Sequence, residues 1–305
     1  MKVEPKYLFI FFVVIAWGFI YAYIQENNPK SEDEVTKTTV GSINDAVKLT
    51  VEGNLNVYYF DVGQADSILL ENNGKYMLID AGNNADGEPL VEYFNDLGIE
   101  SFEYVIATHA HEDHIGGMDD VINNFEVKNF YMPDVVTTSK TFENLLDALE
   151  SRSVAFQTPE IGSLFVFGGC KFEVLHVGTE SDDLNDTSIV VRGLYGNNSF
   201  IFMGDATSNV EEKLLNDNID SDVLKVGHHG SKYSSTVSFL KKVTPQYAII
   251  SVGKNNSYGH PHDVTFSKLN DVGAKIYRTD EDGTIIVSSD GENVAFKTVD
   301  TELDG

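Results

Sequence analysis

A short run of histidines and acids carries the clearest chemical signal in this sequence. Residues 108–117 read THAHEDHIGG, and the spacing H-x-H-x-D-H places ligand-type side chains at His109, His111, Asp113 and His114. The run directly follows the apolar stretch YVIA, so these side chains fan out from a strand end onto a loop and a helix start. Neutral imidazoles and a carboxylate are ligands that suit Zn²⁺ or Mn²⁺. The run therefore predicts a metal site.

Residues at other predicted strand ends suffice for a second cation. Asp205 closes the stretch SFIFMGD, where a carboxylate could bridge two ions. His228 and His229 close DVLKVGHH, and His260 and His262 follow the stretch AIISVG in the segment YGHPH. With the H-x-H-x-D-H run, these residues predict a dinuclear centre, and Asp205 and the pair 228–229 are the strongest additional ligand candidates.

Three more acids near strand ends have a simpler interpretation. Asp61 and Asp66 lie in the segment FDVGQADS, and Asp80 closes the strand YMLID. Acidic side chains at such positions often hydrogen-bond to nearby backbone groups. We therefore expect these acids to be structural, with Asp61 and Asp80 close to the site.

The elements that must position these residues are short apolar strands and amphipathic helices. The stretches NVYYF, SILL, YMLID, KFEVLHV and YAIISVG have the character of strands, and Asn73-Gly74 predicts a hairpin turn. Helical spacing is present in PLVEYFNDLGI, FENLLDALE, NVEEKLL and STVSFLKKV. The first part is rich in strands, and the second alternates strand and helix. This order predicts an α/β fold of two packed sheets with helices outside.

The N-terminal residues predict a membrane segment. Residues 1–24 contain an uncharged apolar run from Tyr7 to Ile24, long enough as a helix to cover the hydrocarbon core of a bilayer. Lysines precede this run and acids follow it, which predicts a single-pass anchor in a bacterial cell membrane with the remainder outside the cytoplasm. Secretion after cleavage of a signal peptide is the alternative. Residues 25–47 predict a flexible linker, and 48–305 a single folded domain.

Composition limits the class of protein. The chain of 305 residues has 23% charged and 42% hydrophobic residues, which excludes a wholly disordered, collagenous or multi-span membrane protein. Its 21 Lys and Arg against 48 Asp and Glu give a net charge of −27, so its overall field repels polyanions. Cys170 is the only cysteine, which excludes an intrachain disulfide, and we interpret it as a buried apolar residue.

These motifs resemble the metallo-β-lactamase superfamily, and most closely the hydrolase domain of ComEC-type DNA-uptake (competence) proteins. The segments that carry the resemblance span residues 57–286 and are FDVGQADSILL, THAHEDHIGG, NDTSIVV, FMGDA, LKVGHHGS, GHPH and YRTDEDGTI. The resemblance implies an αββα metallo-β-lactamase sandwich with two divalent metal ions, Zn or Mn, at one edge of the sheets. It also implies that His109 and His111 bind one metal, Asp113 and His114 the other, and that Asp205 bridges them. Either His228 or His229 completes the ligands of the second metal, and we favour His228.

The sequence departs from the superfamily in one ligand. Many members have a histidine between the H-x-H-x-D-H motif and the G-D strand end, where this chain has residues 185–188, NDTS, as in the ComEC branch. The first metal would then lack one ligand. His176 is the only histidine in between, and it lies inside the strand KFEVLHV. We also expect a stand-alone relative that does not itself conduct DNA, since the polytopic channel of ComEC proteins has no counterpart here.

A dinuclear site predicts hydrolysis by a hydroxide that bridges the two cations, because metal binding lowers the pKa of water from ~15.7 to about 7. Asp113, His229 and His260 are the catalytic candidates, and either histidine could protonate the leaving oxygen. An acid-free stretch from Val223 to His262 favours a phosphodiester substrate such as DNA, since phosphate contacts need positive charge. Its five lysines are Lys225, Lys232, Lys241, Lys242 and Lys254.

The sequence is compatible with more than one class of substrate. We expect the substrate-binding residues to be Asn185, Ser188, Ser231, Lys232 and Tyr258. A metal-dependent phosphodiesterase or DNase is favoured. The first alternative is a hydrolase of a small ester, such as a phosphorylcholine ester, lactone or β-lactam. The second is a metal-binding protein without catalytic activity. The sequence indicates no protein partner.

Overall fold

The structure, a computed structural model, describes residues 54–179 and 183–299. The predicted membrane segment Tyr7–Ile24 and the linker 25–47 lie outside the described residues, as does the predicted start of the folded domain at Lys48. Within the described ranges, the structure contains no helix that is both long and apolar enough to cross a bilayer.

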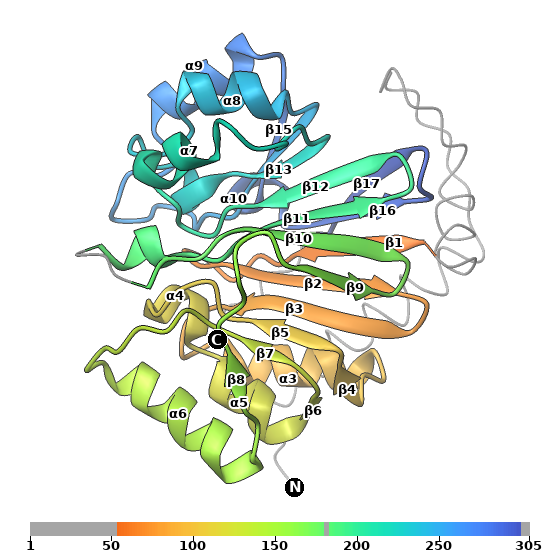
Figure 1. Cartoon of the computed structure of the whole chain (residues 1–305), viewed down its shortest axis with the longest axis vertical. Coiled ribbons are helices and arrows are strands. Elements are labelled where there is room, and N and C mark those ends of the chain that lie inside the picture. Colours follow the sequence, from red (N-terminus) through yellow and green to blue (C-terminus); the bar gives the residue numbers. More distant parts are fainter. Residues whose placement is uncertain (1–53, 180–182, 300–305) are drawn as a thin grey trace, which may run out of the picture.

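Two β-sheets lie face to face, and helices cover the outer face of each (Figure 1). In the described residues, the first sheet has the strand order β17 (Val294–Val299), β16 (Thr284–Ser289), β1 (Leu55–Tyr59), β2 (Ser67–Asn72), β3 (Lys75–Ala81), β5 (Tyr104–Ile106), β7 (Phe130–Tyr131) and β8 (Phe156–Gln157). The second has the order β15 (Lys275–Arg278), β14 (Tyr247–Ile250), β13 (Val223–Lys225), β12 (Asn198–Phe202), β11 (Val190–Tyr195), β10 (Cys170–His176) and β9 (Leu164–Phe167). This arrangement confirms the predicted sandwich.

The helices fall into two groups that match the two sheets. The first sheet is covered by α3 (Gly87–Asp96), α5 (Met118–Asn124) and α6 (Lys140–Arg152). The second is covered by α7 (Ser208–Leu214), α8 (Val237–Val243) and α9 (Asp263–Asp271). Shorter elements are α4 (Glu112–Ile115), α10 (Thr279–Asp282), the 3₁₀ turns η1 (Leu184–Thr187) and η2 (Gly227–Gly230), and the small pair β4 (Ser101–Phe102) and β6 (Glu126–Val127).

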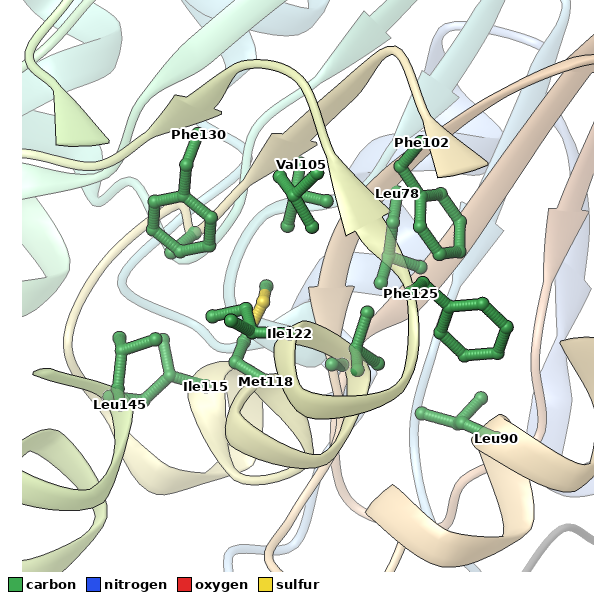
Figure 2. Packing of buried hydrophobic residues seen from close by; sticks show 14 of the residues in the cluster. Leu78, Leu90, Phe102, Val105, Ile115, Met118, Ile122, Phe125, Phe130 and Leu145 are labelled. Atoms are coloured by element: carbon green, nitrogen blue, oxygen red, sulfur yellow. The ribbon is translucent and has the colours of Figure 1, made fainter. Parts of the chain in front are cut away.

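Apolar side chains hold these layers together in three buried clusters. Phe172, Phe202 and Val287 belong to the cluster between the two sheets. A second cluster lies between the first sheet and its helices, and there Val105 and Phe130 face Ile122 of α5 (Figure 2). A third packs the second sheet against its helices. Because most of the central strands are covered on both faces, they read as near-continuous apolar runs in the sequence.

The connectivity brings strand ends from distant parts of the chain together. β3, β5 and β7 are parallel neighbours in the first sheet, and β12, β13 and β14 are parallel neighbours in the second. The carboxyl ends of parallel strands share one edge of a sheet. The Asn73-Gly74 hairpin joins β2 to β3, with both residues at positive φ, as the turn requires. Cys170 is buried at the start of β10, as predicted.

Candidate metal centre

The H-x-H-x-D-H run leaves β5 and enters the short helix α4, which packs closely on the end of β3. The amide of Gly116 donates to the carbonyl of Gly82 (2.8 Å), and the amide of Gly117 donates to the carbonyl of Ala81 (3.1 Å). A Cβ on Gly116 would lie 2.0 Å from the carbonyl carbon of Asn83. The two glycines therefore permit the approach that brings His114 next to the end of β3.

Asp80, at that strand end, holds the run in place. It has a left-handed φ of 60°, and its carboxylate accepts hydrogen bonds from the backbone amide (2.8 Å) and hydroxyl (2.7 Å) of Thr108. Asp80 Oδ2 also lies 2.8 Å from His114 Nδ1. Asp80 thus fixes the ring so that His114 Nε2 faces away from it and toward the site. This contact agrees with the structural role expected for Asp80 near the site.

His109 and His111 lie side by side at the beginning of the run. Thr108 Oγ1 is 3.1 Å from His109 Nδ1, and His109 Nε2 is 3.0 Å from His111 Nδ1. His109 is fully buried, whereas His111 is partly exposed. Two ring nitrogens that face each other at this distance can share a proton or converge on a cation.

Asp205 comes from the other sheet, in the turn after β12. Its backbone amide donates to Ser188 Oγ (3.2 Å), and the preceding Gly204 has a positive φ of 51°. Asp205 is 2% exposed, so its carboxylate is taken almost entirely out of water. A carboxylate in such a place requires charged or hydrogen-bonded partners.

The histidine pair follows β13 and enters η2 with both residues in the left-handed region, His228 at φ 51° and His229 at φ 50°. Non-glycine residues in this region cost of order 1 kcal/mol or more and concentrate at functional sites. This turn points His229 inward, where its Nδ1 is 2.9 Å from the carbonyl oxygen of Ser251. Its Nε2 is 3.4 Å from Asp113 Oδ2 and 3.5 Å from Asp205 Oδ1.

His229, not His228, therefore stands with the Asp113–His114 half of the centre, which corrects our preference for His228 at that position. The ligand atoms of Asp113, His114, Asp205 and His229 all lie within 4.8 Å of one another. The preference rested on distance along the chain from the strand. The two consecutive left-handed residues reverse the order in space.

The ligand atoms of these four side chains form a site that fits a cation. His114 Nε2, His229 Nε2 and Asp205 Oδ1 are buried and make no hydrogen bond within the described residues, although His114 Nε2 and Asp205 Oδ1 are 3.3 Å apart. The other ring nitrogen of each histidine is held by Asp80 or by a backbone carbonyl. Backing of the far nitrogen by a carboxylate or a carbonyl is typical of metal-ligating histidines.

The second oxygen of Asp205 faces a different set of residues. Asp205 Oδ2 is 3.7 Å from His228 Nε2 and 4.0 Å from His109 Nε2, and His111 lies beside His109. The carboxylate thus stands between two groups of ligand-type side chains. His228 lies on the side that lacks the histidine found in many superfamily members, and His176 does not approach it, because its Nε2 is 3.0 Å from the carbonyl oxygen of Asp186.

The electrostatics of the centre follow from buried groups of opposite charge. Burial alone would lower the pKa of His114, but the carboxylates of Asp205, Asp80 and Asp113 raise it well above its ordinary value. Burial would raise the pKa of Asp205, yet His229 and His114 hold it well below the usual range. The metal-free site is thus a network of carboxylates and imidazolium in which a cation can replace protons.

Two residues predicted to bind substrate are instead buried supports. Ser188 is fully buried and bonds to the amide of Asp205, and Ser231 is 1% exposed, with its hydroxyl accepting from the amide of Tyr233 (3.3 Å). Both expectations are corrected. Asn185 is 9% exposed in η1, with Oδ1 buried and without a hydrogen bond in the described part of the chain. Tyr258 is 66% exposed, and Lys232 is also exposed.

One lysine of the acid-free stretch is not available to a substrate, which corrects the expectation from the sequence. Lys225 does not face a substrate: it is fully buried in β13, and its Nζ is 2.6 Å from Asp66 Oδ2. Asp66 Oδ1 in turn lies 3.4 Å from His229 Nδ1. Sequence inspection singled out Asp66 and Lys225 separately, but not their pairing, because they are 159 residues apart. Asp61 Oδ1 accepts from the amide of Gly63 (3.4 Å), a contact with the backbone of its own turn.

Comparison with known proteins agrees with this fold. The family model of the metallo-beta-lactamase superfamily matches residues 60–254, and the chain belongs to this superfamily. Membership of this superfamily, together with the cluster of ligand-type side chains, identifies the chain as a metal-dependent hydrolase.

The chain is similar in sequence to several curated proteins, among them a competence protein. The chain is similar to ComE operon protein 3 of Bacillus subtilis, with 33% identity over 78% of this chain and 33% of the relative. It is also similar to competence protein ComA of Neisseria gonorrhoeae, with 28% identity over 77% of this chain and 32% of the relative. The chain therefore spans about a third of the length of these relatives.

Solved structures share the fold at low sequence identity. The metallo-beta-lactamase fold protein YhfI of Bacillus subtilis has a TM-score of 0.54 and 11% identity, over 77% of this chain and all of YhfI. CmlA, a diiron beta-hydroxylase of Streptomyces venezuelae, has a TM-score of 0.53 and 14% identity, over 74% of this chain and 52% of CmlA. One fold thus hosts different reactions, and the reaction must be argued from the site.

Proposed function

We propose that this chain is a metal-dependent phosphodiesterase that cleaves DNA outside the cytoplasm, held at the cell membrane by residues 7–24. The observation that carries the proposal is the position of Asp205 between two groups of ligand-type side chains. Asp113, His114 and His229 face one of its oxygens, and His109 and His228 face the other. Pairs of divalent cations are a recurrent arrangement in enzymes that cleave phosphate esters.

Each group would hold one cation, of which Zn²⁺ or Mn²⁺ suits the mixed imidazole and carboxylate ligands. When bound, such ions lower the pKa of water and polarise a phosphoryl oxygen. The protein's part is to hold the ligands in a dry, fixed geometry. Asp80, Thr108 and the carbonyl of Ser251 perform this by fixing the far nitrogens of His114, His109 and His229.

His260 is the remaining candidate for a direct role beside the ligands. Its ring centroid is 5.4 Å from that of His228 and 6.4 Å from that of His229. Burial, with the neighbouring His229 and His228, lowers the pKa of His260 to about 4. The ring is therefore neutral near pH 7 and suits hydrogen bonding or stacking with the substrate better than proton donation. His229 Nε2 faces the carboxylates of Asp113 and Asp205, at 3.4 and 3.5 Å, so His229 is a candidate ligand and not the proton donor.

The local charge supports a phosphodiester. Apart from the buried Lys225, the lysines between Val223 and His262 are exposed, and this stretch has no acid in a chain with a net charge of −27. The likeness to competence proteins supports the same class of substrate. Lys232 is the lysine whose place is best defined, since its amide donates to His262 Nδ1 (3.3 Å) on the loop that carries His260.

A substrate panel on the full chain, loaded with Zn²⁺ or Mn²⁺, tests this proposal. We expect cleavage of DNA, a loss of at least about 100-fold in turnover for Asp113→Ala because it removes a ligand, and a rise of about tenfold in KM for Lys232→Ala because it removes a charged contact. Lys75→Ala, an exposed lysine at the opposite end of β3, is the matched control.

A different panel result would replace the proposal. If the loaded chain cleaves neither single- nor double-stranded DNA but hydrolyses phosphorylcholine esters, lactones or β-lactams, the substrate is a small ester. Bound metal without turnover on any of these substrates would indicate a binding protein. The assignment of the ligands is measured separately, by metal content.

A further inference from the structure

A series of nearly parallel rings leads from the metal centre to the surface. The ring planes of His229 and His260 are 23° apart, with centroids separated by 6.4 Å. Those of His260 and Tyr258 are 24° apart, with centroids separated by 5.6 Å. The outermost ring, Tyr258, is 66% exposed and can therefore receive a partner from solvent. We call these three residues the ring ladder.

The loop that carries the outer rings is held in a fixed shape. The side chain of Asn256 accepts from the amide of His260 (3.0 Å) and donates to its carbonyl oxygen (2.6 Å). Asn256 Nδ2 also lies 3.0 Å from the carbonyl oxygen of Gly253. The amide of His262 donates to the carbonyl of Gly230 (3.0 Å), which ties this loop to the turn carrying the metal ligands. The position of Tyr258 is therefore preorganised relative to the centre.

The surroundings of the ring ladder favour an anionic partner with flat groups. Lys232 is exposed, its Nζ lies 5.2 Å from the ring centroid of Tyr233, and its backbone amide donates to His262 on the same loop as Tyr258. No acid occurs in the sequence between residues 223 and 262. Exposed aromatic rings on a surface that also carries positive charge are the combination with which proteins bind single strands of nucleic acid. The rings stack on bases, and the cations contact phosphates.

We infer that Tyr258 is a stacking platform for an unpaired nucleobase of the strand whose phosphodiester lies at the metal centre, so that single-stranded DNA is the preferred substrate. The inference rests on the proposed function and adds the substrate's strandedness. In a duplex both faces of each base are already stacked and the bases are paired, so the ring ladder has no base to receive without local melting. Stacking on a ring face does not distinguish one base from another, so the platform accepts any base.

Binding measurements on the full chain, loaded with metal, test the inference without requiring turnover. The probe is a fluorescein-labelled phosphorothioate oligothymidylate, compared with the same backbone in which the bases are replaced by abasic residues and with a matched duplex. We expect Tyr258→Ala to weaken binding of the oligothymidylate about tenfold. Tyr258→Phe, which keeps the ring, should change it less than about twofold, and neither substitution should affect the abasic strand or the duplex.

Two results would overturn the inference. One is unchanged oligothymidylate binding by Tyr258→Ala, and the other is an equal loss on the abasic strand, which would mean that the phenol contacts the backbone. The proposed function fails independently, if the wild-type loaded chain cleaves no phosphodiester. A chain that binds bases through Tyr258 without cleaving DNA would keep this platform and lose the enzymatic assignment. A chain that cleaves single- and double-stranded DNA without dependence on Tyr258 would keep the enzymatic assignment and lose the platform.

Discussion

At the scale of single residues, each buried histidine of the centre has one ring nitrogen in contact with a supporting residue and the other turned toward the site. His114 is backed by Asp80, His109 by Thr108 and His229 by a backbone carbonyl. A ring with one nitrogen bonded in this way presents the other nitrogen in a fixed direction. The consequence is that the supporting residues should matter to metal affinity although they face away from the cation.

Replacing Asp80 tests this directly. Asp80→Asn keeps the size of the side chain but removes the charge that orients His114, so we expect metal affinity to fall by about 10- to 100-fold. Isothermal titration with Zn²⁺ measures the change. Asp61→Asn is the control, because Asp61 lies in the turn after β1 and outside the ligand groups. Equal affinities for wild type and Asp80→Asn would refute the positioning role.

Proton release on metal binding is a second expectation at this scale. In the metal-free protein the pKa of His114 is raised well above the ordinary value of 6.5 by Asp205, Asp80 and Asp113, against the effect of burial. A cation must displace this proton, so metal affinity should rise with pH. The same raised pKa stabilises the metal-free fold below about pH 6.5, and this contribution is lost as the pH rises through the raised value.

Calorimetry in two buffers with different ionisation enthalpies counts the released protons. We expect about one proton per bound cation at the group that contains His114. Heats that are independent of buffer and of pH would show that His114 is already neutral.

At the scale of elements, a buried ion pair joins the two sheets behind the centre. Lys225 on β13 and Asp66 on the segment between β1 and β2 are at most 1% exposed and 2.6 Å apart. Asp66 also faces His229. Replacing one member of a buried pair leaves an uncompensated charge, whereas replacing both is far less costly.

A double-mutant cycle measures the interaction free energy between Lys225 and Asp66. We expect Lys225→Met to lower the free energy of unfolding by about 3–5 kcal/mol, and the double variant with Asp66→Asn to recover most of the loss. Urea denaturation of the metal-free protein gives the values. Lys171→Met, an exposed lysine on β10, should change stability by less than about 0.5 kcal/mol. If the single and double variants are equally destabilised, the pair contributes through packing and not through charge.

At the scale of the whole molecule, the centre exists only when both sheets are assembled. His109, Asp113 and His114 follow β5 of the first sheet, whereas Asp205 and His229 follow β12 and β13 of the second. A cation that binds residues from both sheets stabilises the folded state by mass action, because the unfolded chain does not bring them together.

Metal should therefore raise the melting temperature. At a free concentration of about 100 times Kd, the expected stabilisation is about 2.7 kcal/mol, which corresponds to roughly 5–10 °C for a domain of this size. Scanning calorimetry with and without a chelator measures the shift. Asp205→Asn should show a much smaller shift, since it weakens the residue that both groups share. A full-sized shift in this variant would remove Asp205 from the centre.

The sequence alone determined the family and the sandwich and indicated most of the candidate ligands, because these depend on local patterns. Apolar runs mark the strands, and the spacing H-x-H-x-D-H and the G-D strand end mark ligands within a few residues of each other. The tertiary structure decided what depends on contacts between distant segments or on the backbone of single turns. The left-handed turn placed His229 instead of His228 beside Asp113, and packing of the sheets buried Lys225 against Asp66.

The same distinction explains the substrate-binding residues. Ser188 and Ser231 lie next to ligands in sequence, and only the fold shows that their hydroxyls are buried supports. Tyr258 and Lys232 are exposed because their loops extend beyond the strand ends. The segments packed against a loop determine which of its side chains face solvent. These contacts are between distant parts of the chain, so the residue types near a ligand do not predict them.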